Sequence, residues 1–166
     1  NKWEKNMIKK IIIILAVFLA GCTSNKTLKH PLDKSKSKTV VLENGLKVYL
    51  LSDPSFNVSA ASVSVEVGSL DNPDDRQGLA HFLEHMLFLG TEKYPDVDEY
   101  SSYLKTYGGY SNAYTASDHT NYQFQVLPDG FEGALDRFSQ FFISPLFTEE
   151  YTAREVNAVN SEHQKN

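Results

Sequence analysis

The sequence predicts an α+β domain built on a mainly antiparallel sheet with helices packed on one face. Two observations predict it: strand patterns fill residues 40–67, and helical patterns then alternate with a second strand region over residues 77–166. Strands joined by short turns pair antiparallel, and amphipathic helices must bury their apolar stripe against the sheet that the strands form. A chain of 166 residues has room for one core of this kind.

The strands are predicted from a turn signal and from alternation. Asn44-Gly45 stands between two apolar segments and supplies the positive φ angles of a tight hairpin turn. Across residues 58–67 one alternating set of positions is clearly more apolar than the other, which indicates a half-buried strand. Residues 110–126 are rich in Tyr, Thr, Asn and Phe, which suggests two further strands joined by a short turn.

The helices are predicted from caps and breakers. They are expected over residues 77–89, 95–107, 129–143 and from 149 to the end of the chain. Gly90 is placed to end the first helix, and Asp96 and Glu99 have the spacing of a capping box at the start of the second. Thr148 is a favourable cap for the last helix.

Charge and cysteine content limit the possible partners. The formal net charge is −5 at pH 7, which argues against a nucleic-acid partner because such a partner requires a basic face. Cys22 is the single cysteine, so no disulfide can form within the chain.

The beginning of the chain has the pattern of a targeting segment. A short basic start at residues 7–10 precedes an apolar run at residues 11–20, about half the ~20 residues that span a bilayer. Small residues then precede Cys22, as in a bacterial lipoprotein signal whose cysteine carries a lipid. The alternative is a buried, unmodified cysteine after an uncleaved apolar segment.

From this pattern we expect three regions. Residues 1–22 form a lipoprotein-type signal segment, residues 23–38 form a polar, lysine- and serine-rich flexible tether, and residues 39–166 form the folded domain. A lipid on Cys22 would attach the protein to a membrane of the bacterial cell envelope, facing the periplasm.

Residues 81–85 carry the strongest chemical signal. His81 and His85 are four apart on a predicted helix, so both imidazoles leave one face about a turn apart and can reach one Zn²⁺ at ~2.0–2.1 Å. Glu84 falls at the edge of that face, where a carboxylate can act as general base on a zinc-activated water. The order H-x-x-E-H is that of the inverzincin peptidases. The alternative is a solvated helix face without metal.

One zinc ligand is missing from this helix, because catalytic zinc usually takes three protein ligands and a water. The residues that could supply it are Glu92, Glu99, His119, Glu155, Glu162 and His163. Glu155 and Glu162 lie seven apart on the last predicted helix and face one way, which suits one ligand and one carboxylate that supports a ligand. Spacing alone does not say which is which, and a plain charged helix face has the same pattern.

Beyond the zinc motif, the chain carries a series of short motifs in a fixed order. They lie at residues 78–91, 93–95, 111–115, 119–122, 132–138, 141–142, 145–147 and 154–163. In this order they closely resemble the pitrilysin and insulin-degrading-enzyme (insulinase) family of inverzincin metallopeptidases, and the resemblance covers nearly everything from Thr39 onward.

The resemblance implies roles for the residues of the metal centre. His81, His85 and Glu162 match the zinc ligands of that family, and Glu84 matches its general base. Glu155 matches a glutamate of that family that contacts a metal ligand and not the metal itself.

The resemblance also implies a substrate. Asn112 and Ala113 match the strand edge that holds the backbone of a bound peptide. An extended peptide that adds to an exposed strand is held by main-chain hydrogen bonds, so its recognition depends little on sequence. The implied activity is that of a zinc-dependent endopeptidase acting on oligopeptides and small polypeptides.

Members of that family are several times longer and enclose a chamber between two halves. The resemblance therefore implies that residues 39–166 are an amino-terminal domain truncated at its C-terminal end. The missing C-terminal domains would be its partners, and the fragment alone is expected to be inactive. Two other functions stay open: a non-catalytic, peptidase-like binding or assembly subunit, and a surface lipoprotein with an incidental metal site.

Overall fold

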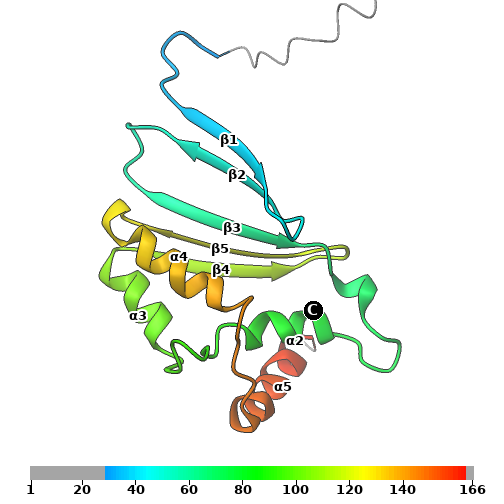
Figure 1. Ribbon diagram of the computed structural model, residues 1–166. Helices are drawn as coiled ribbons and strands as arrows, with labels where there is room; N and C mark the ends of the chain where they lie inside the picture. Colours follow the sequence, from blue (N-terminus) through cyan, green and yellow to red (C-terminus); the bar gives the residue numbers. More distant parts are fainter. Residues whose placement is uncertain (1–28, 164–166) are drawn as a thin grey trace, which may run out of the picture. The chain divides into compact units, whose positions relative to one another are not determined.

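The computed structural model describes residues 29–163 and divides the chain into two compact units, Asn1–Pro54 and Ser55–Asn166. The described part of the first unit is a hairpin of two antiparallel strands, β1 (Lys36–Val41) and β2 (Lys47–Ser52), shown in Figure 1. We expected regular structure to begin at Thr39, and it begins three residues earlier, at Lys36.

The turn of this hairpin differs from the prediction. Gly45 has a φ of +86°, whereas no described residue other than glycine has a positive φ, so Asn44 does not share that conformation. The Asn44 side chain instead accepts a hydrogen bond from the Leu46 N–H over 3.1 Å. The Gly45 N–H donates to the Leu42 carbonyl over 2.9 Å, which gives a longer turn ending in a left-handed glycine. The signal segment predicted for residues 1–22, and residues 23–28 of the tether, lie outside the described residues.

The second unit is built on a three-stranded antiparallel sheet. Its strands are β3 (Ser59–Val65), β4 (Tyr110–Thr115) and β5 (Thr120–Val126), in the order β3-β5-β4. Along β5 every second residue is buried, beginning at Thr120, and along β3 the half-buried positions alternate with exposed ones. One face of the sheet is therefore covered and the other is open, as the alternation predicted.

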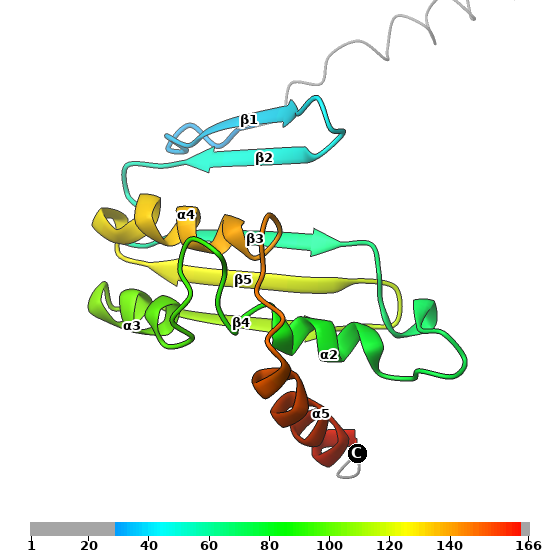
Figure 2. The same ribbon diagram turned by 60° about the horizontal axis from the view of Figure 1, so that its bottom comes forward.

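Helices cover that one face. The unit contains α2 (Leu79–Met86), α3 (Glu99–Thr106), α4 (Phe131–Gln140), α5 (Glu149–His163) and the short helices η1 (Ser69–Asp71) and η2 (Pro128–Gly130). Figures 1 and 2 show α3 and α4 lying along the sheet, with α2 beside the end of β4 and α5 next to α2. The four predicted helices thus occur in order, although α2 is shorter than expected and is followed by turns up to Gly90, whose φ is +94°.

The core lies between the sheet and these helices. Its buried members come from α3, α4, β5 and the turns that follow α2 and α4: Leu87, Tyr100, Leu104, Tyr122, Phe124, Val126, Ala134, Phe138 and Phe141. Five of these side chains are aromatic, and their rings meet edge-on or tilted, as between Phe124 and Phe138 at 5.1 Å. The predicted α+β class, with an antiparallel sheet and helices on one face, is confirmed.

The predicted capping box at the start of α3 is wrong. Asp98, not Asp96, precedes the helix, and its side chain makes no capping hydrogen bond. Glu99 instead binds the Arg137 guanidinium of α4, with an oxygen–nitrogen distance of 2.6 Å. That guanidinium stacks on the rings of Tyr94, at 4.4 Å, and Tyr103, at 3.9 Å. The Glu99 carboxylate, which the local spacing predicted to cap the helix, therefore forms an ion pair with Arg137 of another helix instead.

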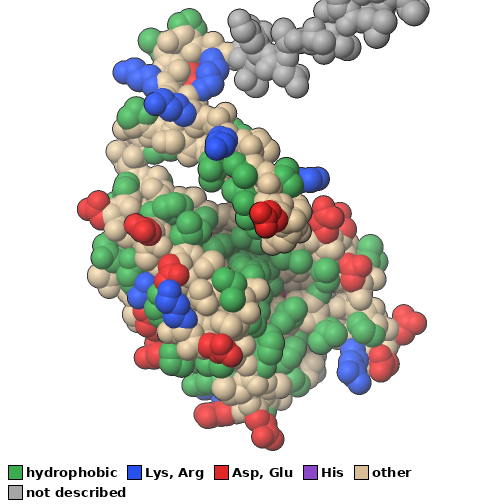
Figure 3. All heavy atoms as spheres, viewed as in Figure 1, with side chains coloured by type: hydrophobic (Ala, Val, Ile, Leu, Met, Phe, Trp, Pro, Cys, Tyr) green, Lys and Arg blue, Asp and Glu red, His purple; other side chains and the backbone are tan. Residues whose placement is uncertain are grey.

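Large apolar side chains also reach the surface of this unit. Ile143 is 68% exposed and Phe147 is 56% exposed. Figure 3 shows one face of the molecule, on which apolar side chains are exposed between acidic side chains. Within residues 29–163, no helix has both the length and the hydropathy needed to cross a bilayer.

Candidate metal centre

The helix that carries the histidines is fixed at its amino-terminal end. It begins directly after Gly78, whose φ is +86°, and the side-chain oxygen of Asn72 accepts a hydrogen bond from the Ala80 N–H over 2.9 Å. Asn72 thereby satisfies one of the free donors of the first turn, as a capping side chain would. Ala80, Glu84 and Met86 are the buried residues of this helix, so its orientation is set by packing.

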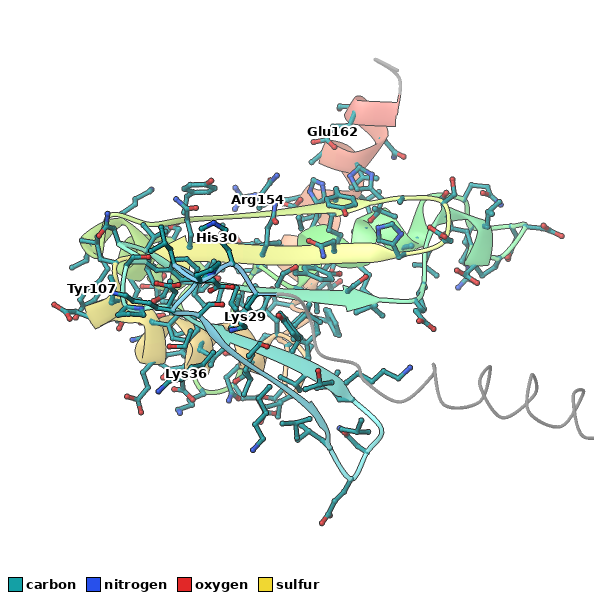
Figure 4. The ribbon with its side chains drawn as sticks, turned by 90° about the horizontal axis from the view of Figure 1, so that it is seen from above. Lys29, His30, Lys36, Tyr107, Arg154 and Glu162 are labelled. Atoms are coloured by element: carbon teal, nitrogen blue, oxygen red, sulfur yellow. The ribbon has the colours of Figure 1, made fainter. Side chains whose placement is uncertain are left out.

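His81, His85 and Glu162 converge on one point. Their ligand atoms all lie within 4.8 Å of one another. The two Nε2 atoms are 3.2 Å apart, and Oε2 of Glu162 lies 3.4 Å from Nε2 of His81 and 3.6 Å from Nε2 of His85. Figure 4 shows that Glu162 comes from the last turns of α5. The structure therefore brings two side chains of α2 together with one that lies 77 positions further along the chain than His85 (162 − 85 = 77).

These separations fit a divalent metal. A tetrahedral zinc site with bonds of ~2.0–2.1 Å has ligand–ligand separations of about 3.3–3.4 Å. Glu155 Oε2 lies 2.9 Å from Nδ1 of His85, so a neutral His85 that donates this proton turns the Nε2 lone pair towards His81 and Glu162. If both Nε2 atoms and the Glu162 carboxylate present lone pairs to this point, a cation between them would remove their mutual repulsion. The donor set of two imidazoles and one carboxylate is among those that bind catalytic zinc.

Glu155 and Glu162, which spacing could not tell apart, have different positions. Glu155 contacts the far nitrogen of His85 and is about as buried as that ring, each side chain being 22% exposed. Glu162 is 49% exposed and faces the two Nε2 atoms. The geometry therefore gives Glu162 the position of a ligand and Glu155 the position of a carboxylate that orients a ligand.

Glu84 lies on the same helix but points into the unit. It is 7% exposed, and its Oε2 accepts a hydrogen bond of 2.6 Å from the Thr115 hydroxyl. Burial raises the pKa of the phenol of Tyr122 on β5, and the negative charge of Glu84 adds to this effect, so that the pKa is about 12. The helix that carries His81 and His85 thus also carries a nearly buried carboxylate, which is held by a hydroxyl of β4.

The remaining ligand candidates lie elsewhere. Glu99 binds Arg137, and His119 lies against Asp118, with an Nδ1–Oδ1 distance of 2.8 Å, and against the Tyr114 hydroxyl. Glu92 is exposed beyond the end of α2. The side chain of His163 lies outside the part that the structure describes.

The two residues predicted to hold substrate lie on β4, which is an outer strand of the β3-β5-β4 sheet. Asn112 is exposed on the open face and Ala113 is half-buried on the other. They are paired to Gln123 and Tyr122 of β5, so the opposite edge of β4 has no strand partner within the described sheet.

Sequence reasoning missed two residues that contact α2, namely Thr115, which binds Glu84, and Asn72, which binds the Ala80 N–H. Thr115 could have been found from alternation, because it shares its face of β4 with Ala113 and not with Asn112. Asn72 gives no such signal: it lies in the turn before α2, eight residues from the N–H that it binds.

Known proteins resemble this chain over most of its length. A family model, that of insulinase (peptidase family M16), matches residues 47–166. An insulin-degrading enzyme of Drosophila melanogaster is 57% identical over 142 residues, which are 86% of this chain and 14% of that protein. A protein of Arabidopsis thaliana named "Insulin-degrading enzyme-like 1, peroxisomal" is 55% identical over 84% of this chain and 14% of its own length. The chain thus spans about one seventh of these relatives.

These relatives correct one prediction. We expected a bacterial lipoprotein facing the periplasm, but the relatives of this identity are eukaryotic, and one of them is named as peroxisomal. The prediction of a bacterial envelope location is therefore wrong. It rested on the pattern before Cys22, a residue outside the described range.

The fold agrees with the sequence matches. The crystal structure of pitrilysin superimposes with a TM-score of 0.76 and 41% identity, and the match covers 84% of this chain and 15% of pitrilysin. The expected resemblance is thus confirmed both in sequence and in structure. The chain belongs to the insulinase family of peptidases, family M16.

Proposed function

We propose that the protein is a zinc-dependent endopeptidase in which His81, His85 and Glu162 hold the metal and Glu84 is the general base. The single observation that carries this proposal is the convergence, within 4.8 Å, of ligand atoms from His81 and His85 of α2 and Glu162 of α5. The same helix α2 also carries the buried Glu84. When bound, zinc lowers the pKa of a coordinated water to about 7 and polarises the carbonyl of the peptide.

Glu84 would move the proton in this reaction. Its carboxylate takes a proton from the water that attacks the carbonyl carbon of the scissile peptide bond. It then delivers that proton to the nitrogen that leaves, so that the carboxylate is regenerated at the end of the cycle. The hydrogen bond from Thr115 occupies Oε2 of Glu84, which leaves Oε1 available for both transfers.

The substrate would be a peptide in extended conformation. The outer position of β4 in its sheet supports binding by strand addition, with Asn112 and Ala113 near the middle of that strand. Main-chain hydrogen bonds of this kind favour oligopeptides and small polypeptides that can be unfolded locally, without a strict sequence requirement.

The experiment is a turnover assay of the full-length protein on a mixed peptide pool, with zinc content measured for every variant. Glu84→Gln preserves the shape of the side chain and removes the base, so it should keep zinc and lose ~10²–10⁴-fold in kcat. Glu92→Gln, which makes the same change at an exposed site just beyond α2, is the control and should leave turnover unchanged.

Two outcomes would contradict the proposal. Zinc-loaded wild-type protein without turnover on any peptide would favour a non-catalytic binding or assembly subunit. A correctly metallated Glu84→Gln variant with wild-type turnover would show that the base lies elsewhere.

A further inference from the structure

The contact between Thr115 and Glu84 joins two elements of the second unit. Glu84 comes from α2 and Thr115 from the last position of β4, 31 residues later. The hydroxyl donates to Oε2 over 2.6 Å, and the carboxylate is 7% exposed, so little water can compete for this bond. Hydrogen bonds to a charged acceptor are shorter and stronger than those between neutral groups.

The proton of the Thr115 hydroxyl has few other acceptors. Across the hairpin, Thr115 is paired with Thr120, whose hydroxyl lies 3.4 Å away. The Thr120 hydroxyl donates over the shorter distance of 2.9 Å to the carbonyl of Val67, and Thr120 is 4% exposed. Since each hydroxyl has one proton, the arrangement sends that of Thr120 to Val67 and that of Thr115 to Glu84.

Both ends of the contact are anchored by the segment that leads into α2. The N–H groups of Ser69 and Leu70 donate to the carbonyls of Ala116 and Ser117, each over 2.9 Å, which fixes the tip of the hairpin just beyond Thr115. The close approach requires Gly68, because a Cβ there would lie 2.5 Å from the Ser117 backbone.

The same segment then reaches the zinc-binding helix itself. Asn72 accepts from the Ala80 N–H over 2.9 Å, one turn before Glu84. The donor and the acceptor of the Thr115–Glu84 bond are therefore held relative to each other by one short stretch of backbone, and neither can move far without breaking these contacts.

From this geometry we propose that Thr115 is a positioning residue that holds the Glu84 carboxylate in the rotamer needed for proton transfer. The inference rests on the proposed function of Glu84. A glutamate has three side-chain torsions, and although a helical backbone disfavours one χ1 rotamer, it does not choose among the several that remain. The Thr115 hydroxyl fixes one oxygen and so fixes the direction of the other.

The test compares Thr115→Val with Thr115→Ser in the full-length, zinc-loaded protein. Valine has the shape of threonine without the hydroxyl, and a misplaced catalytic group costs up to ~10²-fold, so we expect kcat to fall at least about tenfold with little change in KM. Serine keeps the hydroxyl and should restore most of the activity. Thr115→Ala replaces the valine variant if the latter does not fold.

Thr120→Val is the matched control. It removes a buried hydroxyl from the neighbouring strand position, and should lower stability while leaving kcat unchanged, because it does not contact Glu84. A crystal structure of zinc-loaded Thr115→Val provides a readout besides activity: the three ligands should stay in place while the Glu84 carboxylate changes rotamer.

The outcomes separate this inference from the proposed function. If Glu84→Gln abolishes turnover and Thr115→Val does not reduce it, Thr115 has no positioning role and the base assignment stands. If Glu84→Gln itself turns over peptides normally, both fail. A Thr115→Ser variant as slow as Thr115→Val, or a Thr120→Val variant with the same loss of kcat, would overturn the inference by showing that packing and not the hydroxyl is responsible.

Discussion

Glu155 of α5 lies with its carboxylate oxygen 2.9 Å from Nδ1 of His85, on the side of the ring away from His81. The contact joins the last helix of the chain to α2 and fixes which imidazole nitrogen faces His81 and Glu162. A histidine ligand that donates its other N–H to a carboxylate is a better electron-pair donor and has less rotational freedom. The proposed metal centre thus depends on α5 twice: Glu162 is the proposed third ligand, and Glu155 supports the proposed ligand His85.

Loss of Glu155 should therefore weaken metal binding without removing a ligand. We expect Glu155→Ala to lower zinc affinity by ~10–100-fold, and Glu155→Gln, which can still accept the hydrogen bond, to lower it less. Competition titration with a chromogenic chelator measures both. Glu150→Gln, an exposed substitution in the first turn of the same helix, is the control; equal affinities for Glu155→Ala and this control would contradict the supporting role.

Arg137 is expected to be a main support of the packing between α3 and α4. Its guanidinium is stacked between Tyr94 and Tyr103 and paired with Glu99, and the two charged side chains are only 17% and 29% exposed. Arg137→Leu leaves the Glu99 carboxylate without its partner, which should lower the free energy of unfolding by about 2–3 kcal/mol.

Denaturant unfolding measures this effect, and a second variant tests its cause. Adding Glu99→Leu to Arg137→Leu removes the unpaired charge and should recover part of the loss, because apolar replacement of a whole ion pair is often close to neutral. An Arg137→Leu protein within about 0.5 kcal/mol of wild type would show that the pair contributes no more than an ordinary surface contact.

The free energy of unfolding should decrease in alkaline solution because of the raised pKa of Tyr122. Burial and the Glu84 carboxylate raise the pKa of this phenol from 10.0 to about 12. Between these values the folded protein keeps a proton that the unfolded chain has lost, so stability is full below pH 10 and falls as pH rises towards 12. The free energy of unfolding, measured at several pH values above 9, should fall less steeply with pH for Tyr122→Phe than for wild type. An equal dependence on pH in both proteins would contradict the raised pKa of Tyr122.

How much the sequence predicts depends on whether the signal is local. The H-x-x-E-H helix and the alternation along β3 follow from spacing within one element, and both occur as expected. Contacts between distant elements could not be predicted in this way. Glu99 has good capping-box spacing, yet Arg137, 38 residues away, binds it instead, because a stacked guanidinium stabilises the carboxylate more than a helix terminus does.

The metal centre illustrates the same limit. Residue spacing placed Glu155 and Glu162 on one face of a helix but could not say which of them meets the histidines. That depends on how α5 lies against α2, a tertiary arrangement that gives one carboxylate to Nδ1 of His85 and the other to the two Nε2 atoms. The Thr115–Glu84 hydrogen bond depends likewise on how α2 packs beside β4.

The 166-residue chain, expressed alone and loaded with zinc, should bind the metal but turn over peptides very slowly. All three proposed ligands lie within it, whereas it spans only 14% of its Drosophila relative. The oxyanion that develops during peptide hydrolysis needs placed donors, and loss of one such donor typically costs ~10²–10³-fold. An assay beside the full-length protein tests this; turnover within about tenfold, roughly 1.4 kcal/mol in the barrier, would show that the chain contains the whole catalytic machinery.

The most direct test of the metal centre is the zinc content of purified protein, measured by elemental analysis for wild type, His81→Ala and Glu162→Gln. We predict one zinc per wild-type chain and little or none in either variant after dialysis against a weak chelator, because each variant removes one of the three convergent proposed ligands. Circular dichroism confirms that the variants remain folded. One zinc per chain in wild type and in both variants would contradict the assignment of His81 and Glu162 as ligands.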